Sequence, residues 1–146
     1  LEDPVGRYEF LDDVALADCA VEVEGKDVDD LFETAASALA EVMVESATVP
    51  TTVERAITIE APQLDLLLYD WLSELIYRKD RDREIFTRTR VKVEGTGPFY
   101  LTAQARGGAI DPERTALRAD AKAVTFHQFA LAPVEGGWRA RIVIDI

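Results

Sequence analysis

Two stretches of the chain have apolar residues spaced three and four apart, the pattern of a helix that buries one face. The first runs from about Val28 to Glu45 and the second from about Gln63 to Lys79. Asp27 is a favourable N-cap for the first helix, and Pro62 stands where a helix start tolerates proline. The apolar stripes are Val28, Leu31, Phe32, Ala35, Leu39, Val42 and Met43 in the first helix and Leu64, Leu67, Leu68, Trp71, Leu72, Leu75 and Ile76 in the second.

Apolar and polar residues alternate in most of the remaining chain, which predicts strands with one buried face. In the segment 53–61, for example, Ile57, Ile59 and Ala61 alternate with polar neighbours. Glycines predict hairpin turns at 95–98 and 135–137, and residues 107–119 are predicted as a long loop. The predicted strands cover residues 8–11, 19–23, 53–61, 85–94, 99–105, 122–131 and 138–146.

Neither the amphipathic helices nor the half-polar strands can bury their apolar faces alone. The economical arrangement is an α+β fold, a two-layer sandwich in which two main helices pack on one face of a largely antiparallel sheet. A chain of 146 residues suits one domain, and no linker or repeat divides it. We therefore expect residues 1–146 to form a single domain.

The charge balance limits the classes of partner. The sequence holds 28 acidic and 16 basic residues, a net charge of −12. This average field repels a phosphate backbone, so we expect no strong direct binding of nucleic acid, and it favours metal ions or a basic protein partner. Basic residues do cluster at 78–83 and 88–92. The first cluster is interleaved with acids and predicts a solvated helix end.

Targeting signals and disulfides are not expected either. The apolar run Leu66 to Leu68, like every other apolar run in the sequence, is far shorter than the roughly 20 residues that cross a bilayer, which predicts no membrane association. Leu1 to Pro4 carry acid where a signal peptide is basic. Cys19 is the only cysteine and is expected to be a small buried residue. These features together favour a cytoplasmic protein.

The residues needed for common catalytic sites are missing from the sequence. His127 is the only histidine, which excludes zinc sites built from two or three imidazoles. Neither a glycine-rich phosphate loop nor a Gly-x-Ser-x-Gly elbow occurs, and Cys19 has no evident base nearby. We therefore expect no catalytic residue and no enzyme. His127, beside Thr125 and Phe126 in a predicted strand, is either an ordinary strand residue or a residue with a catalytic or ligand role.

Carboxylates remain as candidates for chemistry. Asp18 stands at the entry of a predicted core strand, where burial without a partner is costly, so it faces water, caps backbone or holds a cation. Asp145 precedes Ile146, whose terminal carboxylate is a second hard oxygen donor. Ca²⁺ and Mg²⁺ prefer such donors, although an ordinary solvated chain end is the alternative.

Several segments, in their order and spacing, resemble the archease family and span nearly the whole chain. The segments are Tyr8 to Asp12, Ala17-Asp18, Glu24 to Lys26, Asp30 to Phe32, Leu66 to Leu75, Asp111 to Arg114, Lys122 to His127, Gly137 to Arg139 and Ile144 to Ile146. The resemblance implies a fold similar to the sandwich above. It also implies a divalent-cation site, usually for Ca²⁺, with Asp18, Asp145 and Ile146 as the metal ligands.

The sequence departs from the family pattern after the first predicted strand. Members commonly show Asp/Glu-His-Thr-Ala-Asp there, whereas residues 12–18 form a longer stretch without histidine. Asp12 and Asp13 are therefore candidates for additional metal ligands. Lys122, which matches the lysine of a family segment, and His127 are candidates for facing a partner.

By resemblance, the chain is a protein cofactor that activates a GTP-dependent RNA-splicing ligase, its expected partner. Family members promote the ligase's guanylylation and allow multiple turnover. Two other functions stay open at this point: a general chaperone or accessory protein of RNA modification, and a small metal-dependent hydrolase using the same carboxylates.

Overall fold

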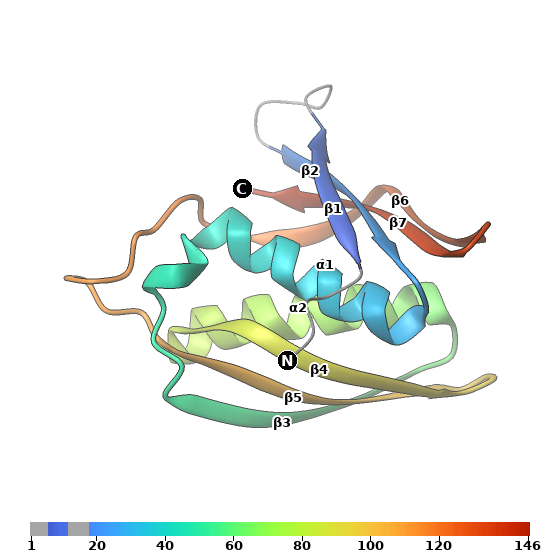
Figure 1. The fold of residues 1–146 in the computed structure, drawn as a ribbon, viewed down its shortest axis with the longest axis horizontal. Helices are drawn as coiled ribbons and strands as arrows, with labels where there is room; N and C mark the ends of the chain where they lie inside the picture. The colour runs from blue at the N-terminus through green and yellow to red at the C-terminus, as the bar shows by residue number, and fades with distance from the viewer. Residues whose placement is uncertain (1–5, 12–17) are drawn as a thin grey trace.

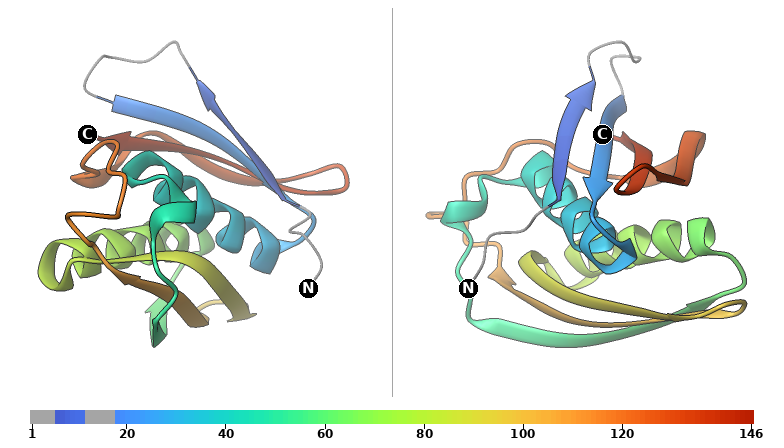
Figure 2. Two further views of the ribbon diagram at one scale, coloured as in Figure 1. Left: turned by 60° about the vertical axis from the view of Figure 1, so that its left-hand side comes forward. Right: turned by 45° about the vertical axis from the view of Figure 1, so that its right-hand side comes forward.

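The computed structural model describes residues 6–11 and 18–146. These residues form two α-helices and seven strands. Their arrangement is a central layer of helices with one antiparallel sheet on each side (Figure 1; Figure 2). The elements in chain order are β1 (Arg7–Leu11), β2 (Asp18–Gly25), α1 (Val28–Met43), a 3₁₀ turn (Ser46–Thr48), β3 (Val53–Ala61), α2 (Leu64–Asp82), β4 (Glu84–Gly95), β5 (Phe99–Ala109), β6 (Ala123–Val134) and β7 (Gly137–Asp145).

The α+β class, the two helices and the antiparallel pairing are confirmed, but the strands form two sheets instead of one. One sheet has the order β1-β2-β7-β6 and the other β3-β5-β4. Helix α1 packs on β2 and β7 of the first sheet and on β4 of the second. The helices thus lie between two sheets and do not cover a single outer face.

Two sheets are needed because α1 is buried on more of its surface than the predicted apolar stripe. Ala36, Ala38 and Ala40 lie outside that stripe and are at most 1% exposed. A helix that is apolar nearly all round needs cover on both sides, and small alanine side chains let a second layer approach closely. Alternating strands alone did not indicate how many sheets they form.

Helix α1 also covers the free edge of β4. The backbone N–H of Val93 donates to Asp29 Oδ1 at 2.8 Å, and that of Val91 donates to Glu33 Oε2 at 2.8 Å. Asp29 and Glu33 are four residues apart and therefore lie on one face of the helix. Their carboxylates take the place of a neighbouring strand at an edge that would otherwise offer unpaired donors.

Within the basic segment at the end of α2, Lys79 alone is buried and so departs from the predicted solvated state, whereas residues 80–83 are exposed as predicted. Lys79 is buried, and its ammonium donates to the Ala121 carbonyl at 2.8 Å and contacts the Asp80 and Asp120 carboxylates. The predicted loop 107–119 also begins later, because β5 continues to Ala109. A Cβ on Gly107 would approach the Ile85 carbonyl oxygen to 1.9 Å, so glycine is required for this pairing with β4.

None of the helices among residues 6–11 and 18–146 has the length and apolarity to cross a membrane.

Candidate functional site

Asp18 and Asp145 come from distant parts of the chain and meet as cross-strand neighbours. Asp18 is the first residue of β2 and Asp145 the last of β7, and the antiparallel register places them directly opposite each other. Figures 1 and 2 show the C-terminus beside the start of β2 from every side drawn. Directly opposite residues have Cβ atoms about 4.5–5.5 Å apart. We call Asp18 and Asp145 the aspartate pair.

The aspartate pair points away from the helices. Along β7, Ile142 and Ile144 belong to the core, so Asp145 lies on the opposite face of the sheet. Asp18 shares that face because it stands opposite Asp145. Both side chains are half-buried. Two like charges directly opposite each other destabilise a sheet, so this position favours a positively charged neighbour.

Lys122 and Ile146 lie at the same end of the sheet. The backbone N–H of Lys122 donates to the Asp145 carbonyl at 2.8 Å, and Ala123 is the register partner of Asp145 on β6. Lys122 is exposed and Ile146 half-buried. The structure therefore brings together the backbone of Lys122, the aspartate pair and Ile146.

The other predicted residues do not join this arrangement. Asp12 and Asp13 lie outside the described residues. Within 6–11 and 18–146, no group of three or more histidine, cysteine, aspartate or glutamate side chains is placed to hold a metal ion. His127 is exposed and lies in an irregular part of β6, between Thr125 and Ala130, where the register with β7 shifts.

The irregular part of β6 carries an aromatic cluster that the sequence did not indicate. Phe126 stacks on Tyr69 of α2 at a centroid distance of 4.1 Å, and Phe129 meets both rings edge-on. Phe126 nevertheless remains 56% exposed. Gln128 has a φ of 57°, the left-handed conformation that lets β6 leave its regular path here. His127 thus borders an exposed aromatic surface and lies away from the aspartate pair.

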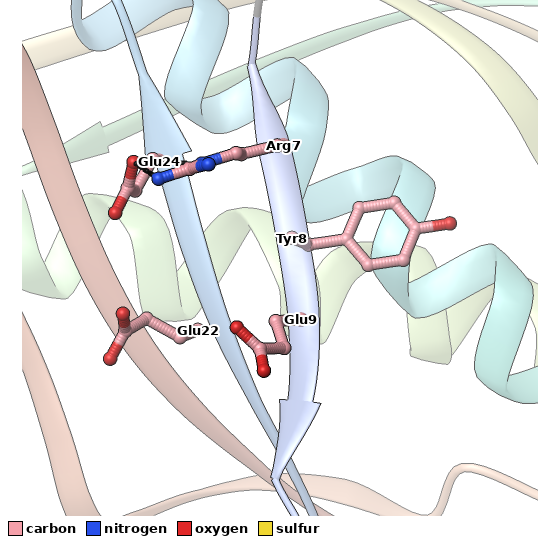
Figure 3. A pocket seen from close by; sticks show the side chains of 5 residues that line it. All are labelled: Arg7, Tyr8, Glu9, Glu22 and Glu24. Atoms are coloured by element: carbon pink, nitrogen blue, oxygen red, sulfur yellow. Dashed lines mark hydrogen bonds and ion pairs between the residues drawn. The ribbon is translucent and has the colours of Figure 1, made fainter.

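Further acidic residues line the same outer face, farther along β1 and β2. Glu9 stands opposite Glu22, and Arg7 opposite Glu24. Figure 3 shows these four side chains on one side of the strands, while Tyr8 points towards α1. They border a shallow depression of about 330 Å³. The alternation of Glu22 and Glu24 with buried valines could have indicated this face from the sequence.

Arginines partly neutralise this face. Arg7 Nε donates to Glu24 Oε2 at 3.0 Å, and Arg139 Nη2 donates to Glu24 Oε1 at 3.1 Å. Hydrogen bonds from Arg7 and then Arg139 hold the pKa of Glu24 below its usual 4.5. No such ion pair involves Asp18 or Asp145 within the described part of the chain. The aspartate pair therefore differs from Glu22 and Glu24, which both form ion pairs with arginine.

Comparisons with known proteins find similarity to archease proteins over most of the chain. Residues 8–146 match the Archease protein family (MTH1598/TM1083). Protein archease of Methanosarcina barkeri is 35% identical over 142 residues, which cover 96% of each chain. Protein archease of Methanothermobacter thermautotrophicus is 35% identical over 140 residues, 95% of this chain and 98% of that one.

Solved structures show the same fold. The solution structure of protein 1598 from Methanobacterium thermoautotrophicum has a TM-score of 0.78 and 33% identity, covering 95% of this chain and 98% of that chain. The crystal structure of a Thermotoga maritima protein described as an archease and possible chaperone has a TM-score of 0.63. It covers 100% of this chain and 98% of its own, and its 15% identity supports the fold alone. The family match over residues 8–146 and relatives at 35% identity show that this chain belongs to the archease family.

Proposed function

We propose that this chain is a protein cofactor, without catalytic chemistry of its own, that activates a GTP-dependent RNA-splicing ligase by promoting its guanylylation and multiple turnover. Membership of the archease family supports this proposal. The observation that carries it is the register of β2 and β7, which sets Asp18 directly opposite Asp145. The residues that the family resemblance selects from opposite ends of the chain are therefore neighbours in space.

The donor atoms fit a hard divalent cation. Asp18 and Asp145 offer carboxylate oxygens and Ile146 offers backbone oxygen, and oxygen atoms are the ligands that Ca²⁺ and Mg²⁺ prefer. Ca²⁺ takes about six to eight oxygens, so water or a partner completes the shell. A bound cation would supply positive charge between the two aspartates and towards a partner's phosphates.

The position of the aspartate pair suits a contact with another protein. Both carboxylates are half-buried, lie on the outer face and mark the end of the sheet, so a partner can reach them without opening the core. The hydrogen bond from Lys122 to the Asp145 carbonyl fixes the last strand in place. A rigid pair of carboxylates can order a metal ion in a ligase pocket, which is assembly of a site rather than a reaction.

The test is guanylylation of the purified ligase with GTP and Ca²⁺ or Mg²⁺ in the presence of Asp18→Asn or Asp145→Asn protein. We expect each variant to stimulate guanylylation at least about tenfold less than the unchanged protein, because the loss of one interaction of about 1.4 kcal/mol already gives that factor. Asparagine keeps the shape and removes the charge, so folding is preserved.

Glu9→Gln is the matched control. It also removes one carboxylate from the outer face of the same sheet, but from an exposed position on β1 away from the aspartate pair. We expect this control to stimulate the ligase like the unchanged protein. Full stimulation by both aspartate variants would contradict the proposed function of the pair.

A chaperone function is the second candidate, and the exposed aromatic cluster favours it. Phe126 presents more than half of its side chain to solvent beside Tyr69 and Phe129. Exposed apolar surface of this kind can bind a client protein. Recovery of the ligase in a pull-down from native cells, unchanged by Phe126→Ser, would favour ligase activation. Loss of protection against client aggregation in the same variant would favour the chaperone.

A further inference from the structure

The outer face of the β3-β5-β4 sheet concentrates basic side chains in an acidic protein. In β4, exposed Arg90 and Lys92 alternate with the core residues Val91 and Val93, so the basic side chains point away from the helices. The β3-β5-β4 sheet turns its far side outward, and none of the described elements lies over it (Figure 1; Figure 2). We define the basic surface as Arg88, Arg90 and Lys92 of β4 together with Arg106 of β5.

The internal interactions of the fold do not account for the basic surface. Arg88 stands directly opposite Arg106 in the register of β4 and β5. Like charges in this position lower the stability of a sheet. Among the residues described, Arg88, Arg90 and Arg106 form no ion pair, and Lys92 contacts only Glu94, at 3.1 Å. Three guanidinium groups are therefore available to an external anion.

The spacing of these charges fits a linear polyanion. Arg88, Arg90 and Lys92 recur every second residue of a strand, about 6.7 Å apart. Between the strands, Arg90, Lys92, Thr102 and Gln104 line a shallow depression of about 200 Å³. This is a row of cations beside hydrogen-bonding side chains, which suits phosphate groups that follow one another along a chain.

An exposed aromatic ring extends the same face. Tyr100 alternates with the buried Leu101 and therefore shares the outer face with Arg106, and it is 46% exposed. Tyr100 stands opposite Glu94 on one side and Glu60 on the other. A flat ring on an open sheet beside a row of cations is the arrangement on which unpaired bases stack.

We propose that the basic surface and Tyr100 bind single-stranded nucleic acid, with the phosphates along β4 and a base on Tyr100. This inference goes beyond activation of the ligase and does not depend on it. It assigns a weak contact that depends on salt and not on base sequence. The occupant is a polynucleotide and not an acidic protein because a stacking ring accompanies the charges.

The net charge of −12 does not prevent this contact. The acidic outer face of the first sheet lies on the other side of the helix layer. Two layers, each about 10 Å thick, separate it from the basic surface. At about 0.1 M salt, charges are screened over about 10 Å, so a phosphate on the basic surface is affected mainly by local side chains. Glu54, Glu60 and Glu94 lie on the same face and confine the positive area to β4 and β5.

The experiment measures fluorescence anisotropy of a labelled oligouridylate with the full chain at several NaCl concentrations. We expect a Kd of about 10⁻⁵ M and a log–log salt slope of about −2, because each phosphate contact on a single strand contributes about 0.7. Arg88→Gln/Arg90→Gln should weaken binding about tenfold at low salt and reduce the slope by about 1.4. Tyr100→Ala should weaken binding about fivefold and leave the slope unchanged.

Lys26→Gln/Arg114→Gln is the matched control, because it removes two exposed positive charges from loops outside the basic surface. Thermal melting verifies that every variant is folded. We expect the control to bind like the unchanged chain. An equal loss in the control would overturn the proposal in favour of bulk charge. Equal competition by polyglutamate and unlabelled oligouridylate would overturn it in favour of an acidic protein partner.

Discussion

Lys79 shows how a single buried charge can hold two distant segments together. Its ammonium reaches from α2 to the Ala121 carbonyl and to Asp120, immediately before β6. Lys79→Met keeps the length of the side chain but leaves that carbonyl without its donor. We expect a loss of about 1–3 kcal/mol in the free energy of unfolding, measured by urea denaturation. Lys92→Met, at an exposed pair with Glu94, should change it by no more than about 0.5 kcal/mol. Equal losses would show that burial of Lys79 is not the cause.

The same contact has a defined pH dependence. The hydrogen bond from Lys79 lowers the pKa of Asp120 below its usual 3.8, so the stability it contributes is present above that value and is lost as pH falls through the lowered pKa. Burial lowers the pKa of Lys79, but hydrogen bonds to Asp120 and Asp80 outweigh it and raise the pKa above 10.5. The stability linked to Lys79 is therefore lost only as pH rises through that raised value. The difference between wild type and Lys79→Met should shrink in strong acid.

At the scale of elements, the edge of β4 depends on two carboxylates of α1. Burial raises the pKa of Glu33 above its usual 4.5, although the bond from the Val91 N–H opposes this. The charged form is thus disfavoured by folding, and stability from this group increases as pH falls through the raised pKa. Glu33→Gln keeps an acceptor without the charge and should leave the unfolding free energy at neutral pH unchanged or up to about 1 kcal/mol higher. Glu33→Ala leaves the N–H unpaired and should lower it by about 1–2 kcal/mol. Equal effects of both substitutions in urea denaturation would contradict this role.

The same elements show what a sequence pattern can and cannot predict. Alternation predicted β3 at 53–61, the bounds found in the structure, because the inward side chains of Ile57, Ile59 and Ala61 meet the core. It missed the end of β5, since Gly107 and Gly108 have no side chain to alternate, and it gave no sign that Glu33 would bind a strand edge. Spacing along a chain describes one element at a time. Contacts between elements require knowledge of the register.

The candidate site is a whole-molecule property for the same reason. No pattern within residues 18–23 or 138–146 indicates that β2 pairs with β7, and only the family resemblance grouped Asp18 with Asp145 before the structure placed them opposite each other. Only the chemistry of the imidazole makes His127 a candidate in the sequence. Its place beside the aromatic cluster follows from the irregular pairing of β6 with β7. The alternation of apolar and polar residues does not indicate such an irregularity.

The cation proposed for the aspartate pair would tie the first part of the fold to its last strand. A ligand that binds only the folded chain stabilises it by about 2.7 kcal/mol at a hundredfold excess over its Kd. For a domain of this size, the melting temperature should rise by about 5–10 °C in saturating Ca²⁺ and return when EDTA is added. Asp145→Asn should abolish the increase, whereas Glu9→Gln should retain it. If the oxygens of Ile146 complete the site, a short Gly-Ser extension after Ile146 should reduce the increase more than the same extension before Leu1. Equal increases in melting temperature for the two extended chains would remove Ile146 from the ligand set and leave the aspartate pair to be judged by its own substitutions.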